Sequence, residues 1–120
     1  MTGPDGSAAP EDQRRAIEEA MRHVAELRAH GHQVILTHGN GPQVGNVLLK
    51  NQLSADVVPP VPLDWCVATT QATIGTLVLN ALGGRTAVVV TRTLVDAADP
   101  AFADPVKPIG RYFSEEEAAR

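Results

Sequence analysis

Residues 37–45 read THGNGPQVG, and this glycine-rich stretch lies between a short apolar run and a segment with helical periodicity. Residues 34–36 before it (VIL) predict a buried strand of a parallel sheet. Residues 42–53 after it carry apolar side chains at helical spacing and predict a helix. A strand, a glycine turn and a helix in this order are typical of an α/β protein, so this stretch decides the predicted fold class.

Another helix is predicted on the N-terminal side of this stretch. It begins near Pro10, because proline suits a first helical turn, and it ends at Gly31. Its apolar face consists of Ile17, Met21, Val24 and Leu27. Residues 1–9 are small and polar without periodicity, and we expect them to form a flexible lead.

Three more elements are predicted on the C-terminal side. The proline-rich residues 54–62 predict a connection that is not helical. A helix is expected to open with Asp64 as its cap and to end at the two glycines of residues 83–84. Residues 87–90 (AVVV) predict a second buried strand, and residues 96–110 predict an ordered loop or a small hairpin.

The composition argues against several classes of function. The 120 residues carry a formal net charge of −4 and only 3% aromatic residues, and no basic run is present, so we expect no nucleic-acid partner. No apolar stretch approaches the ~20 residues that span a bilayer, and no secretory signal is visible, so no membrane partner is expected. The single cysteine, Cys66, excludes an internal disulfide framework and favours a reducing, cytoplasmic setting.

The glycine-rich stretch is the strongest candidate for a functional site. Ligands of parallel α/β proteins bind beyond the carboxyl ends of strands, and glycines let the backbone approach a ligand closely. Because free N–H groups at a helix start attract anions, these residue types indicate a site for phosphate or another small anion. The alternative is a tight turn that binds nothing. The stretch has neither the Gly-Lys-Ser/Thr end of a Walker A loop nor the glycine spacing of a dinucleotide-binding loop.

Several segments together resemble one enzyme family. Residues 38–45 (HGNGPQVG) resemble the second glycine-rich loop of the carbamate kinases, whereas other members of the amino acid kinase family usually differ at the position of Asn40. The further matches are residues 11–14 (EDQR) with the family's first helix, 62–66 (PLDWC) and 70–75 (TQATIG) with its next helix, and 95–102 (VDAADPAF) and 107–110 (KPIG) with its protruding lid.

The resemblance implies a fold, a reaction and a set of site residues. The fold would be α/β, a partial three-layer αβα sandwich of the amino acid kinase type. The reaction would convert ATP and carbamate, with Mg²⁺, to ADP and carbamoyl phosphate. Gly39, Asn40 and Gly41 would present donors to the phosphoryl group, and the lid lysine, Lys107, would neutralise charge on its oxygens.

Other polar residues have plainer expected roles. Lys107 by itself is a surface lysine, so its catalytic role depends on the resemblance alone. Asp64 and Asp96 are expected to be a helix cap and a loop hydrogen-bonder rather than metal ligands, and no metal ligand is assigned. Cys66 is expected to be a small core residue, and Gln71 is a weaker candidate for the acceptor site.

The resemblance also implies a domain organisation. Residues 10–120 would be part of the N-terminal, carbamate-binding and phosphoryl-accepting domain, with the lid at about residues 96–112. The family's first glycine-rich loop and its C-terminal nucleotide-binding half have no counterpart in this sequence. The lone chain is therefore expected to be inactive, and the alternatives are a partner chain that carries the nucleotide half, a non-catalytic remnant, or a small-anion binding domain. The family further implies a cytoplasmic homodimer that serves arginine metabolism.

Overall fold

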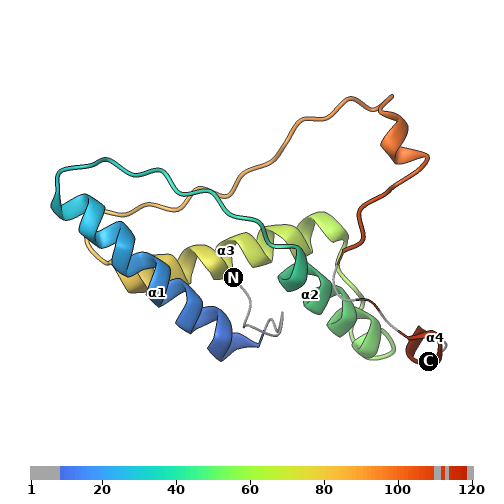
Figure 1. Cartoon of the computed structure of the whole chain (residues 1–120). Coiled ribbons are helices and arrows are strands. Elements are labelled where there is room, and N and C mark those ends of the chain that lie inside the picture. The colour runs from blue at the N-terminus through green and yellow to red at the C-terminus, as the bar shows by residue number, and fades with distance from the viewer. Residues whose placement is uncertain (1–8, 110–111, 113, 119–120) are drawn as a thin grey trace.

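The computed structural model describes residues 9–109, 112 and 114–118 (Figure 1). Its elements in chain order are α1 (Pro10–Ala29), α2 (Gly41–Ser54), α3 (Leu63–Leu82), the 3-10 turn η1 (Pro100–Phe102) and α4 (Glu115–Ala118). α3 packs against both α1 and α2, so it is the central helix of the layer. Within the described residues, no helix is both long and apolar enough to cross a membrane.

α1 begins and ends as its sequence predicts. Pro10 lies in the first turn together with two acidic residues, which the positive end of the helix dipole favours. The buried face consists of Ile17, Met21 and Val24. Leu27, predicted for the same face, is 48% exposed. Gly31 has a φ of 87°, a left-handed conformation that glycine adopts without a steric penalty, and it follows the end of the helix.

The hydrophobic core lies between α1 and α3. Its buried members are Ile17, Met21, Val24 and Ile74, and its partly buried members are Val34, Leu77, Val78 and Leu82. α3 ends at Leu82, and Gly83 directly after it has a φ of 57°, as the glycine pair predicts. The expected cap at Asp64 is wrong, because Pro62 precedes the helix without a side-chain cap and Asp64 lies inside the first turn.

The two predicted strands are extended segments, but neither is a strand within the described part of the chain. Residues 34–36 and 87–90 have no backbone hydrogen bonds with each other. Side chains hold them to the helices instead: Val34 packs on the core, and Val88 lies against Gly75 of α3. The sandwich that was predicted from these strands is therefore not seen, because a sheet needs ladder bonds that these segments do not form.

The segment after the second extended run leaves the helical layer. In Figure 1 it rises away from α3, carries η1 at its far end and then returns toward the other elements. Leu94 is 99% exposed and Val106 is 85% exposed, so neither side chain packs on the helices. We call residues 92–109 the protruding segment. The predicted lid at about residues 96–112 overlaps it, although residues 110 and 111 lie outside the described residues.

Candidate functional site

The glycine-rich loop ends at the N-terminus of α2. Asn40 is the residue before the helix and accepts a hydrogen bond from the N–H of Val44 at 2.9 Å. No side chain caps the helix. Among the described residues, the N–H groups of Gly39 and Gly41 have no partner, so they remain available to an anion at the positive end of the helix.

The chain's own fold does not require glycine at Gly39 or Gly41. Neither residue has a positive φ, and a Cβ added at either position would meet no atom within 4 Å. The backbone there therefore borders open space. This geometry permits the close approach of a ligand to the backbone that the sequence predicts.

The side chain of Asn40 is turned toward α3. Its amide nitrogen donates to Oγ1 of Thr70 at 2.7 Å and to the carbonyl oxygen of Val67 at 3.4 Å. The Thr70 hydroxyl in turn donates to Val67 at 2.8 Å, so Oγ1 must accept from Asn40, and this fixes which end of the amide faces α3. The donors that Asn40 can offer to a ligand are therefore reduced to its backbone N–H.

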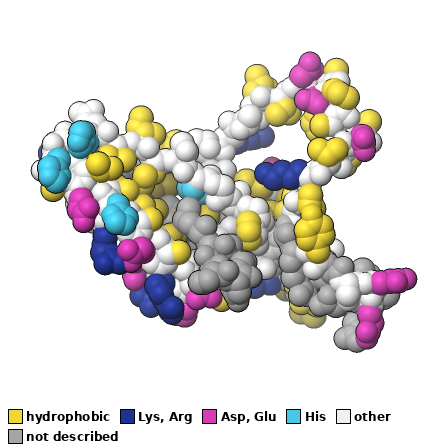
Figure 2. Space-filling view, in the orientation of Figure 1, with side chains coloured by type: hydrophobic (Ala, Val, Ile, Leu, Met, Phe, Trp, Pro, Cys, Tyr) yellow, Lys and Arg dark blue, Asp and Glu magenta, His cyan; other side chains and the backbone are white. Residues whose placement is uncertain are grey.

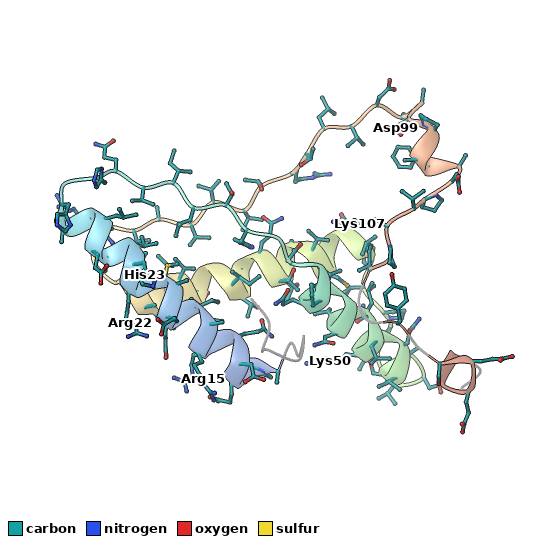
Figure 3. All side chains as sticks on the ribbon, viewed as in Figure 1. Arg15, Arg22, His23, Lys50, Asp99 and Lys107 are labelled. Carbon is teal, nitrogen blue, oxygen red and sulfur yellow. The ribbon has the colours of Figure 1, made fainter. Side chains whose placement is uncertain are left out.

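Lys107 lies on the returning arm of the protruding segment, on the side that faces the helical layer (Figure 3). Its side chain is exposed. The space-filling view shows an open hollow between the protruding segment and the helices, with Lys or Arg side chains at its edge (Figure 2). Lys107 thus lies where the returning segment approaches the helical layer, and among the described residues no hydrogen bond joins it to the glycine loop.

The carboxylates of this region have structural roles. Oδ1 of Asp96 accepts from the N–H of Ala98 at 2.9 Å, which confirms the expected loop hydrogen bond. Asp99 caps η1 in the same way, through the N–H of Ala101 at 2.8 Å. Within the described ranges, no three His, Cys, Asp or Glu side chains gather into a group that could hold a metal ion.

Gln71 of α3 and Asn51 of α2 make hydrogen bonds that the sequence does not predict. Gln71, a weaker candidate for the acceptor site, binds the backbone of Thr91 instead. Asn51 donates to Sγ of Cys66 at 3.3 Å and to the carbonyl of Val61 at 3.2 Å. Cys66 is fully buried, which confirms its expected place in the core. These contacts join residues 10 to 20 positions apart, and no local pattern in the sequence signals them.

Comparison with known proteins gives consistent relatives. No protein-family model matches the chain. The carbamate kinase of Halobacterium salinarum is 44% identical over 99% of this chain, and the match covers 39% of that protein. Carbamate kinase 1 of Enterococcus faecium is 42% identical over 88% of this chain and 37% of its own length.

Solved structures agree with these sequence matches. The carbamate kinase from Giardia lamblia bound to citric acid superposes with a TM-score of 0.88 at 38% identity, over 99% of this chain and 41% of that one. A protein from Aeropyrum pernix superposes with a TM-score of 0.87 at 36% identity. The chain spans about two fifths of the length of the curated relatives it matches, and over that span its homologues are carbamate kinases.

Proposed function

We propose that this chain is the carbamate- and phosphoryl-binding part of a carbamate kinase, which transfers a phosphoryl group between ATP and carbamate. The observation that carries the proposal is the glycine loop at the start of α2. There, unpaired N–H groups of Gly39 and Gly41 border open space at the positive end of a helix. The names of the relatives supply the substrate class.

In this reaction a carbamate oxygen forms a bond to the γ-phosphorus of ATP while the bond to the β-phosphate bridging oxygen breaks and ADP leaves. Carbamate is already an anion, so the step needs no base. Positioning and charge neutralisation are what the protein must supply. The loop N–H groups would hold the phosphoryl oxygens, and Lys107 would approach them from the protruding segment.

We assign no residue of this chain to the binding of the nucleotide or of the metal ion. One solved relative, from Giardia lamblia, is bound to AMP-PNP, so ATP is the donor that we propose. The nucleotide-binding half would be supplied by residues beyond these 120, in the same polypeptide or in a partner chain. The described residues offer no three-residue acidic group to Mg²⁺, so no residue is assigned to the ion and no step is routed through it.

Reconstitution tests this proposal. The chain is assayed for ADP formation from ATP and carbamate, alone and mixed with the parts of the Halobacterium salinarum relative that it does not cover. We expect no turnover from the chain alone and turnover from the mixture. Lys107→Ala should lower the rate of the mixture by about 10²-fold, the usual loss for one charge-stabilising group.

Lys50→Ala is the matched control, because Lys50 is an exposed lysine on α2 whose removal should leave the rate unchanged. Turnover by the 120-residue chain alone, abolished by Lys107→Ala, would show that these residues already hold a complete site. Equal rates for the two lysine variants in the mixture would remove Lys107 from the reaction.

A further inference from the structure

Two consecutive residues of α3 hold two different parts of the candidate site. Thr70 is buried and accepts the hydrogen bond from Asn40 of the glycine loop at 2.7 Å. Gln71 binds Thr91, the residue before the protruding segment. Consecutive helical residues point about 100° apart around the axis, so one turn of α3 can reach both the glycine loop and the second extended run.

The contact between Gln71 and Thr91 is a double one. Nε2 of Gln71 donates to the carbonyl oxygen of Thr91 at 3.1 Å, and Oε1 accepts from the N–H of Thr91 at 2.8 Å. A neighbouring strand satisfies a residue in the same way, by exchanging both N–H···O bonds with it. The Gln71 amide therefore takes the place of a strand partner at Thr91, the residue that directly follows the second extended run.

Thr91 is also where the chain leaves the helical layer. Among the described residues, every hydrogen bond of the protruding segment is made within that segment. The segment therefore has no polar tie to α1, α2 or α3 after Thr91. The contacts that hold Thr91 in place therefore also hold the start of the protruding segment, which carries Lys107 (Figure 3).

We propose that Gln71 is a positioning residue that anchors the root of the protruding segment, and that together with Thr70 it sets the placement of Lys107 relative to the glycine loop. The anchoring rests on the two hydrogen bonds alone, while its effect on Lys107 rests on the proposed function. Gln71 acts through the backbone of Thr91 and touches no reacting atom in this account.

Amide hydrogen exchange tests the anchoring. Gln71→Ala removes both bonds, so exchange at the Thr91 amide should rise about tenfold. Thr73→Ala is the matched control, because Thr73 is exposed on the same helix and its hydroxyl binds only the Thr69 carbonyl of that helix. Equal exchange at Thr91 in both variants would overturn the anchoring, and so would a wild-type chain whose amides all exchange alike.

Gln71→Glu separates a specific hydrogen-bond pair from general packing. A protonated carboxylic acid has the same shape as the amide and offers one donor and one acceptor, whereas a carboxylate offers acceptors only and would face the Thr91 carbonyl. Below about pH 4 the acid keeps both bonds, whereas the carboxylate at neutral pH keeps only the bond from the Thr91 N–H and repels the Thr91 carbonyl oxygen, so protection of the Thr91 amide should be weaker at neutral pH, after correction for intrinsic exchange. Protection that does not depend on pH in Gln71→Glu would contradict the proposed bond pair.

Inorganic phosphate tests the effect on Lys107. Gln71→Ala should weaken phosphate binding several-fold in the wild-type chain and have no further effect in Lys107→Ala, because the anchor acts through that lysine. An equal loss in both backgrounds would overturn the link to Lys107. If the wild-type chain binds no phosphate at the loop, the proposed function fails, and exchange at Thr91 still decides the anchoring.

Discussion

Gly39 and Gly75 are glycines in this chain for different physical reasons. A Cβ on Gly39 would meet nothing within 4 Å, so its lack of a side chain leaves room that the protein itself does not fill. A Cβ on Gly75 would lie 2.4 Å from Cγ1 of Val88, too close for any contact to survive unchanged. Gly39 thus belongs to a surface that is open to a ligand, and Gly75 belongs to the packing of the second extended run on α3.

Substituting alanine at these two glycines should therefore have unequal effects on stability. Gly75→Ala should cost about 1–3 kcal/mol, because Val88 must move away from α3 or be strained. Gly39→Ala should change stability by no more than about 0.5 kcal/mol, since it meets no neighbour. The temperature at which half of the helical circular dichroism signal is lost ranks the two variants, even where the loss is broad. If Gly39→Ala melts at a lower temperature than Gly75→Ala, the described packing of residue 88 on α3 is wrong.

At the scale of the elements, we expect the stability of the first turn of α1 to depend on pH. The Arg14 guanidinium donates to Glu11 at 2.8 Å, and this bond together with its charge lowers the pKa of Glu11; Arg14 also pairs with Glu18 at 2.9 Å. A lowered folded pKa means that Glu11 stabilises the helix above its ordinary pKa, near 4.3, and stops doing so as the pH falls below it.

The substitution Glu11→Gln should remove this dependence of helix stability on pH. We expect the helical signal of wild type to fall more than that of Glu11→Gln between about pH 5 and pH 3, by a small amount because the pair is exposed to solvent. Circular dichroism at 222 nm over that range measures the difference. Parallel curves for the two chains would mean that the pair does not persist in solution.

The helices could be predicted from the sequence because their ends are marked locally. Pro10, Gly31 and Gly83 lie where the structure begins or ends a helix, and the buried faces repeat at helical spacing. Strand pairing could not be predicted in the same way, since an apolar run such as residues 87–90 indicates an extended backbone but not whether a partner lies beside it.

In the candidate site, too, the local features could be predicted from the sequence and the long-range contacts could not. The glycine loop was found from its residue types at the start of a helix, and its open backbone fits that prediction. The contacts that hold the loop and the protruding segment in place join Asn40 to Thr70 and Gln71 to Thr91, which are 30 and 20 positions apart. No spacing rule in the sequence connects these residues, because only the packing of α3 brings them together.

At the scale of the whole molecule, the chain is more open than a compact domain of its size. Its radius of gyration is 17.0 Å, whereas about 14 Å is expected for 120 residues. Several large apolar side chains are more than half exposed in the described part, namely Ile35, Leu53, Val57, Val58, Trp65, Val89, Val90, Leu94, Val95, Phe102 and Val106. The two extended runs also leave backbone groups without ladder partners, a common route to aggregation.

The chain by itself should therefore be marginally stable or aggregate. We expect a broad loss of helical signal on heating, without the sharp transition of a cooperative domain, because the buried core lies mainly between α1 and α3. Calorimetry combined with light scattering measures both properties. A sharp transition from a monomeric sample would show that the open backbone and apolar side chains are covered in solution.

The most direct test of the central claim is an NMR titration of the chain with inorganic phosphate. We expect amide shifts at residues 39–45, with any other shift limited to the neighbourhood of Lys107, and a millimolar dissociation constant, which is a binding free energy on the order of 4 kcal/mol, because only a few donors converge there. Gly41→Val should abolish the shifts, since a branched side chain would fill the open space beside the backbone. Shifts scattered over surface arginines, or the same shifts in Gly41→Val, would contradict a phosphoryl site in this loop.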